Sequence, residues 1–237
     1  MFSRSAEYYD EIYASLGKNY EAEARRLRLL ITRHKRSDGR ALLDVACGTG
    51  KHAAVLSRWY QVEGVDLDAA MLRVARKKHP GIRFHQGDMV DFDLGKQYDV
   101  VTCLFSSIGY VRTPARLRAA LRTMARHLRP GGVLLLEPWF STRQWHPGSV
   151  RMSVNARSVR TIVRMSHTAR RGRESILTFE YLIGTGKGIN RASEIHRMGL
   201  FSSSEYKLAL QRAGLEVLHD ARGLAGRGLY IAKKPLT

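Results

Sequence analysis

ALLDVACGTG, residues 41–50, joins a short apolar run to two glycines separated by one residue. The apolar run predicts a buried strand over residues 41–45. Gly48 and Gly50 predict a tight turn whose backbone can approach a ligand closely. A helix is expected next, over residues 52–59. A strand, a glycine turn and a helix in this order are typical of open parallel sheets, which bind ligands at the carboxyl ends of their strands.

The same alternation continues on both sides of this stretch. Before it, a helix is expected over residues 20–34, with its acidic residues first and its arginines later, as the helix dipole favours. After it, a helix over 68–78 has Asp68 as N-cap, and a helix over 114–128 is ended by Pro130-Gly131-Gly132. Strands are expected over residues 62–66, 82–85, 99–105 and 133–137. This alternation predicts an α/β, doubly wound, mostly parallel sheet with helices on both faces.

The rhythm changes after Pro138. Three strands over residues 159–168, 176–183 and 195–201 predict a small antiparallel insertion. A helix over 203–213 and strands over 215–219 and 228–232 then complete the sheet with an antiparallel edge. We therefore expect a single Rossmann-like domain over 1–237 with a seven-stranded sheet. Its parts are an N-terminal helical lid (1–37), a cofactor-binding core (38–140), the insertion (141–202) and the C-terminal completion (203–237).

The charge of the chain is strongly positive and unevenly spread. It has 40 basic and 21 acidic residues among 237, a formal net charge of +19. Residues 141–237 carry 17 basic and 6 acidic side chains, a net of +11. Such a field favours anionic partners, either nucleic acid, phosphorylated small molecules or a membrane surface, although a plain solvated basic surface explains it as well.

Other features narrow the class of protein. The two cysteines, Cys47 and Cys103, form no CxxC motif, which argues against a disulfide scaffold and for a reducing compartment. The first residues lack the apolar run of a signal peptide, and no apolar run is long enough to span a bilayer. We expect a cytoplasmic protein without a membrane partner. No metal is expected, because HxH and HExxH clusters are missing.

Two acidic residues follow the next strands of the predicted sheet. Asp66 ends the strand over 62–66, where a carboxylate can bind both hydroxyls of a ribose. Asp88 follows the strand over 82–85, where it can accept the exocyclic amine of adenine while Met89 packs on the ring. The third glycine of a dinucleotide fingerprint is replaced by Ala53, which argues against a nicotinamide cofactor. DVACGTG (44–50), GVDLD (64–68) and HQGDM (85–89) together resemble motifs I, II and III of the class I S-adenosylmethionine-dependent methyltransferases.

More specific motifs extend the resemblance along nearly the whole chain. FSSIGY (105–110), LEPWF (136–140), RMSH (164–167) and GRGL (226–229) occur in this order, after YD (9–10) and GKNY (17–20). Together they resemble the N,N-dimethyltransferases that finish amino sugars such as desosamine and mycaminose on a thymidine diphosphate carrier. The resemblance implies that a neutral sugar amine attacks the sulfonium methyl group of S-adenosylmethionine, and that S-adenosylhomocysteine leaves. It also implies a homodimer.

The resemblance also implies roles for individual residues. The cofactor-binding residues would be Tyr9 and Tyr20 at the methionyl part, Asp44, Ala46 and Gly48 along the loop, Asp66 at the ribose, Asp88 and Met89 at the adenine, and Phe105. The catalytic residues would be Ser107, Tyr110 and Glu137, with Tyr110 or Glu137 as proton acceptor. Trp139 and Phe140 would shape the sugar pocket. Arg227 and one or more of His167, Arg170, His196 and Arg197 would meet the phosphates. Each of these side chains could instead serve packing or a salt bridge.

Other functions stay open on the sequence, among them methyl transfer to another small-molecule amine or to RNA. Arg118, Arg122 and Arg126 lie on one face of a predicted helix and could follow the phosphates of RNA. Against RNA methylation, FSSIGY stands where an amine-flipping [DNS]-P-P-[YF] motif would follow the fourth strand. The second alternative is a protein that binds the cofactor without catalysis.

Overall fold

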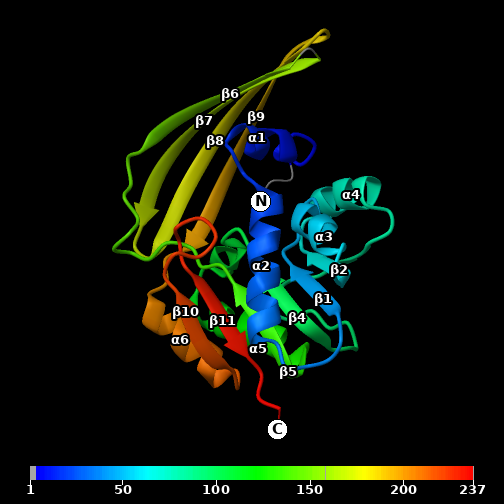
Figure 1. The fold of residues 1–237 in the computed structure, drawn as a ribbon. Helices are drawn as coiled ribbons and strands as arrows, with labels where there is room; N and C mark the ends of the chain where they lie inside the picture. Colours follow the sequence, from blue (N-terminus) through cyan, green and yellow to red (C-terminus); the bar gives the residue numbers. More distant parts are fainter. Residues whose placement is uncertain (1–3, 158, 237) are drawn as a thin grey trace.

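Two sheets make up the structure, a computed structural model that describes residues 4–157 and 159–236 (Figure 1). The larger sheet has seven strands in the order β10-β11-β5-β4-β1-β2-β3. Their bounds are β1 (Ala41–Val45), β2 (Gln61–Asp66), β3 (Arg83–Gln86), β4 (Tyr98–Cys103), β5 (Leu128–Leu136), β10 (Glu216–Asp220) and β11 (Leu229–Lys233). The smaller sheet is antiparallel and has the strands β6 (Val150–Arg157), β7 (Arg160–Arg171), β8 (Glu174–Thr185) and β9 (Gly188–Gly199).

Helices cover both faces of the large sheet. The helices are α1 (Tyr9–Ser15), α2 (Tyr20–His34), α3 (Lys51–Leu56), α4 (Ala69–Lys78), α5 (Pro114–Arg126) and α6 (Ser203–Arg212), with a 3-10 helix η1 (Ser107–Val111). Successive residues of a strand point to opposite faces, so Leu42 packs with α2, α3 and α4 while Leu43 packs with α5 and α6. Both leucines are fully buried. The expected doubly wound architecture is thus confirmed, with one hydrophobic core on each face.

The parallel half matches the predicted elements closely. The helix over 20–34 is α2, and Asp68 caps α4 by accepting from the N–H groups of Ala70 and Met71. The stop signal Pro130-Gly131-Gly132 was misplaced, because α5 already ends at Arg126 and these residues lie within β5. There the pairing of β4 with β5 shifts register between Tyr98 and Val100, and Gly131 adopts a φ of 72°.

The expected antiparallel edge is confirmed, because the edge strand β10 pairs antiparallel with β11. The antiparallel strand is β11, which pairs with β10 on one side and with β5 on the other. After α6 the chain returns as β10 at the edge of the sheet, and β11 then fills the gap beside β5. The edge strand β10 therefore runs in the same direction as the parallel strands.

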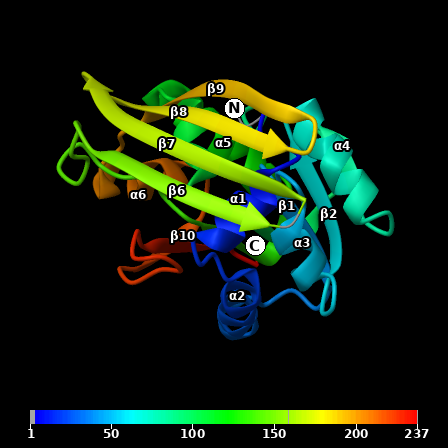
Figure 2. The ribbon, with the colours of Figure 1, turned by 90° about the horizontal axis from the view of Figure 1, so that it is seen from above.

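The insertion has four strands, whereas the sequence predicts three. The missed strand is β6, in which the apolar Val150 and Met152 are 62% and 65% exposed while the polar Asn155 is buried. In β6 the apolar side chains therefore face solvent and a polar one is buried, which is the reverse of an ordinary half-buried strand. Seen from above, α1 lies beneath β6 and β7 of the small sheet (Figure 2). Ile12 of α1 packs against Ile162, Phe179, Tyr181 and Ile183 of the small sheet.

Within residues 4–157 and 159–236, no helix combines the length and the apolar character needed to cross a membrane. The division into lid, core, insertion and completion stays a prediction, and its positions 1–3, 158 and 237 lie outside the described residues.

Candidate functional site

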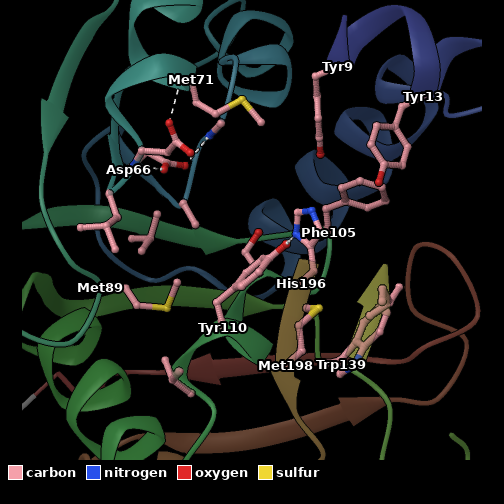
Figure 3. A pocket seen from close by; sticks show the side chains of 18 of the residues that line it. Tyr9, Tyr13, Asp66, Met71, Met89, Phe105, Tyr110, Trp139, His196 and Met198 are labelled. Carbon is pink, nitrogen blue, oxygen red and sulfur yellow. Dashed lines mark hydrogen bonds between the residues drawn. The ribbon is translucent and has the colours of Figure 1, made fainter. Parts of the chain in front are cut away.

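A cavity of about 890 Å³ opens at the carboxyl ends of the parallel strands. Its floor comes from residues that end or follow strands, namely Val45, Ala46 and Gly48 after β1, Val65 and Asp66 at β2, Gly87, Asp88 and Met89 after β3, Phe105 and Ser107 after β4, and Trp139 after β5. Its roof comes from α1 and from the inner face of the small sheet (Figure 3). The location agrees with the rule that open parallel sheets bind ligands at this edge.

The glycine loop after β1 leaves room for a ligand. Ala46 and Gly48 have φ angles of 57° and 56°, and a Cβ added at Gly48 would meet nothing within 4 Å. The Asp66 carboxylate accepts the N–H groups of Gly48 and Asp68, each at 2.8 Å. Burial raises the pKa of Asp66, although these hydrogen bonds oppose the shift. Asp66 therefore braces the loop and lines the cavity at the same time.

The remaining cofactor candidates divide into two groups. Asp88, Met89, Tyr9 and Phe105 line the cavity, and the Asp88 carboxylate also pairs with Arg116 at 2.7 Å. Asp44 and Tyr20 are not among the lining residues. Asp44 is buried behind the loop and accepts from Thr102 Oγ1 at 2.8 Å, and burial raises the pKa of Asp44 to about 6. The Tyr20 ring packs on that of His52 at 4.8 Å.

Helix α1 lines the cavity and is bonded to the loop after β1, to α4 and to the small sheet. Tyr9 and Tyr13 point from it into the cavity, with ring centroids 4.6 Å apart (Figure 3). On the side of the glycine loop, Asp10 accepts from Thr49 Oγ1 at 2.5 Å and pairs with Lys78 at 2.6 Å. On the other side, Glu11 pairs with Arg160 of β7. Helix α1 falls within the expected lid (1–37), whose role as a lid stays a prediction, and Tyr13 is a cavity residue that the sequence reasoning missed.

The loop after β4 is fixed by Glu137, which the sequence reasoning placed among the catalytic residues. Glu137 is completely buried, lies outside the cavity lining and accepts the Phe105 N–H at 2.7 Å and Arg227 Nη2 at 2.6 Å. Phe105 itself has a φ of 53°. Ser107 and Tyr110 line the cavity on η1. Of the expected proton acceptors, the geometry thus favours Tyr110 over Glu137.

Tyr110 belongs to a buried chain of polar groups. Its hydroxyl lies 2.6 Å from His196 Nδ1 (Figure 3). On the other side of the ring, His196 Nε2 lies 3.6 Å from a carboxylate oxygen of Glu194. Burial raises the pKa of Tyr110 well above its usual value. Burial lowers the pKa of His196, although Glu194 opposes that shift. At neutral pH His196 is therefore an uncharged imidazole that touches the cavity.

The candidates for binding the rest of the substrate are scattered. Trp139 lines the cavity and donates from Nε1 to Ser175 Oγ at 2.8 Å. Arg227, His196 and Arg197 also line it. Phe140 lies outside the lining and packs on Trp139 and Trp145. His167 and Arg170 are exposed and outside it as well. His167 points to the outer face of the small sheet, and Arg170 donates to the carbonyl of Gly172 in its own hairpin.

No three histidine, cysteine, aspartate or glutamate side chains within residues 4–157 and 159–236 gather where they could hold a metal ion. The polar side chains that line the cavity are instead tyrosines, arginines, acids, one histidine, one lysine, one asparagine and one serine.

Comparison with known proteins identifies the family. A family described as "Methyltransferase domain" matches residues 42–132. A dTDP-3-amino-3,6-dideoxy-alpha-D-glucopyranose N,N-dimethyltransferase of Streptomyces fradiae is 41% identical over 95% of this chain and 89% of its own length. The chain belongs to the sugar N,N-dimethyltransferases that use S-adenosylmethionine. The motifs in residues 44–50, 64–68 and 85–89 predicted this cofactor correctly.

Solved structures agree with the fold of the methyltransferase. The crystal structure of Streptomyces venezuelae DesVI superposes with a TM-score of 0.92 at 38% identity, covering 97% of this chain and 98% of that one. The S-adenosylmethionine-bound CalS10, an amino pentose methyltransferase from Micromonospora echinaspora, gives a TM-score of 0.86 at 39% identity, covering 95% and 96%. The predicted Rossmann-like fold and the resemblance to amino-sugar methyltransferases are both confirmed.

Proposed function

We propose that this methyltransferase transfers methyl groups to the amino nitrogen of a deoxyamino sugar carried on thymidine diphosphate, giving the dimethylamine. The S. fradiae relative and DesVI span nearly the whole chain, including the small sheet that roofs the cavity. The cavity has a volume of about 890 Å³. Ligand pockets usually have volumes of roughly 300–1,000 Å³, so a small molecule of this class can be accommodated.

The cofactor fits the half of the cavity that faces the glycine loop. The open space over Gly48 admits a ligand close to the backbone, and the Asp66 carboxylate stands beside it for the ribose hydroxyls. Asp88 and Met89 would hold the adenine, and Tyr9 on α1 would cover the methionyl part. Bound there, S-adenosylmethionine supplies an electrophilic methyl group on a sulfonium.

One observation carries the diphosphate part of the proposal. Arg227 lines the cavity, and its Nε is buried without a hydrogen-bond partner among residues 4–157 and 159–236. Arg164 is not among the lining residues, but its Nη1 is also buried without a hydrogen-bond partner in the described part of the chain, and its guanidinium lies 5.4 Å from the ring of the cavity residue Tyr13. Buried guanidinium donors without partners are costly, and phosphate oxygens satisfy them bidentately. A diphosphate between the sugar and the nucleoside would bind here.

The protein's own residues align the reaction and exclude water. Tyr13, Phe105 and Trp139 line the cavity and would form the walls around the reacting amine and methyl group. Holding two reactants in line within a closed cavity can lower the activation free energy by roughly 7–11 kcal/mol at the ideal limit. An amine that binds as an ammonium ion must lose a proton before it attacks. Because burial keeps the Tyr110 phenol protonated, Tyr110 would take up that proton only while passing its own to His196 Nδ1, 2.6 Å away.

Substitution of Arg227 tests the substrate class. Arg227→Lys keeps the charge but loses the planar guanidinium that can bind a phosphate bidentately, so KM for a thymidine diphosphate amino sugar should rise. Arg227→Ala should raise it further, by about ten- to a hundredfold, because a charge-assisted hydrogen bond contributes roughly 1.5–3 kcal/mol. The control is Arg170→Ala, which removes an exposed arginine outside the cavity. An unchanged KM in Arg227→Ala, with weakened cofactor binding instead, would contradict the assignment.

We further propose that the methyltransferase is a homodimer. Large apolar side chains are exposed on the outer face of the small sheet, and a second copy would cover them. They are Val150, Met152, Val154, Met165 and Leu182. Light scattering on the wild type and on Met152→Lys tests this, with the variant expected to be monomeric. A monomeric wild type would refute it. The cytoplasmic location stays a prediction.

A further inference from the structure

Glu194 on β9 lies behind the cavity, and its carboxylate is surrounded by donors. Its Oε1 accepts the N–H groups of Arg4 and Ser5 at 2.9 and 3.0 Å, and its Oε2 accepts Ser5 Oγ at 2.9 Å. Tyr181 donates to Oε2 at 3.3 Å, and His196 Nε2 lies 3.6 Å away. The side chain is almost inaccessible to solvent. A buried carboxylate with this many donors is held in one orientation.

The charge states of Glu194 and His196 follow from these contacts. Burial alone would raise the pKa of Glu194, but the interactions with His196 and Ser5 outweigh it and lower the pKa. Glu194 is therefore ionised at neutral pH while His196 is uncharged. An ionised carboxylate next to Nε2 favours the tautomer that carries its proton on Nε2. Nδ1 is then the acceptor, and at 2.6 Å it faces the hydroxyl of Tyr110.

From these contacts, and resting on the function proposed above, we infer that Glu194 is a positioning residue for a proton relay through His196 and Tyr110. The N–H bond of the bound ammonium breaks, and its proton passes to Tyr110 Oη. The proton of Tyr110 passes to His196 Nδ1 in the same step. This leaves a neutral amine, a neutral tyrosine and an imidazolium ion beside the Glu194 carboxylate.

The relay is completed by the amine and by solvent. The lone pair of the neutral amine forms the new N–C bond, while the S–CH3 bond breaks and its electron pair stays on sulfur. When the product leaves, the imidazolium proton returns to water. A second methyl transfer repeats the same sequence on the monomethylated amine.

Other groups around His196 do not take the place of Glu194. The charged and titratable groups that act on His196 are Tyr110 of η1, which lies 2.6 Å from Nδ1, Arg164 of β7 and Glu194 of its own strand. Among these residues Glu194 is the one carboxylate, and Arg164 opposes protonation of the ring. Only Glu194 among them can therefore stabilise the imidazolium.

The test compares Glu194→Gln with the wild type over a range of pH. Near neutral pH the variant should lose about tenfold or more in kcat, with KM for the nucleotide sugar and for S-adenosylmethionine nearly unchanged, since general acid–base catalysis typically contributes 10²–10⁴-fold. The deficit should shrink as pH rises, because the amine then arrives already deprotonated. In the variant, the acidic limb of the plot of kcat against pH should move to lower pH, because loss of the carboxylate lowers the pKa of His196.

Three further variants separate the relay from a structural role. Glu180→Gln makes the same change on the outer face of the neighbouring strand and should behave like the wild type. Ser5→Ala removes one hydrogen bond to Glu194 but keeps the charge, so its pH profile should also be unchanged. A double variant of Tyr110→Phe with Glu194→Gln should be no slower than Tyr110→Phe alone, because both interrupt one chain.

A spectroscopic measurement tests the tautomer without any turnover. The ¹⁵N shifts of the His196 ring should show a neutral imidazole with its proton on Nε2 at pH 7, and an Nδ1 proton would overturn the relay. A Glu194→Gln loss that is equal at every pH, or that lies wholly in KM, would also overturn it. If the wild type methylates no nucleotide-linked amino sugar, the proposed function itself fails, and the wild-type assay alone reveals that.

Discussion

Replacing Glu137 by glutamine should weaken the fold more than almost any other isosteric change in the chain. The carboxylate is completely buried, with one oxygen accepting the Phe105 N–H at 2.7 Å and the other accepting Arg227 Nη2 at 2.6 Å. A glutamine amide offers one acceptor and one donor, so it must point its NH2 group at one of these two donors. Removing one partner of a buried ion pair costs about 3–5 kcal/mol, because the other charge remains buried.

The expected size of the effect on melting follows directly. In a domain of this length each kcal/mol shifts Tm by about 2–4 °C, so Glu137→Gln should lower Tm by about 6–20 °C. Because the Arg227 side chain is 16% exposed, the lower part of that range is expected. The assay is thermal unfolding with Glu180→Gln as control, since Glu180 is exposed and bonded to Ser193. A Tm within about 2 °C of the wild type would refute the view that Glu137 holds the cavity wall.

Three further changes have definite outcomes. S-adenosylhomocysteine at a hundredfold excess over Kd should stabilise the wild type by about 2.7 kcal/mol in a thermal-shift assay. Asp66→Ala should lose most of this stabilisation, and an undiminished shift would contradict the assignment of Asp66 to the ribose. Changing Arg118, Arg122 and Arg126 together to glutamine should leave kcat/KM for the small substrate within a few-fold, because none of them lines the main cavity; selective loss of methyl transfer to RNA would instead favour that alternative. Burial raises the pKa of Asp44 to about 6, so the stability that its protonated form contributes at low pH is lost as pH rises through that value. The Tm of Asp44→Asn relative to wild type should therefore increase between pH 4 and pH 7, and a constant difference would show that Asp44 does not titrate there.

Local patterns were sufficient for the parallel half of the fold. Helix α2 and strand β1 begin and end where the sequence predicts, because apolar periodicity and capping residues are properties of neighbouring positions. The order of the last two strands depends on pairing between distant residues, and no local pattern contains it. Strand β6 was missed for a different reason, because its apolar side is exposed and Asn155 is buried.

The candidate site shows the same division. Asp66, Asp88 and Tyr110 could be placed from motifs that follow strands, and the structure brings them to one cavity. Tyr13 could have been found, since it lies four residues after Tyr9 and such pairs share a helix face. Glu194 could not, because its contacts with Ser5 join positions 189 residues apart in the sequence.

The most direct test of the proposed function is incubation of the purified methyltransferase with methyl-labelled S-adenosylmethionine and a thymidine diphosphate amino sugar, followed by mass spectrometry and NMR of the product. We predict that two labelled methyl groups appear on the sugar nitrogen, the first in a transient monomethyl product. Label on a sugar oxygen would contradict the proposal, and so would the transfer of label to a free amine or to RNA while the nucleotide sugar stays unlabelled.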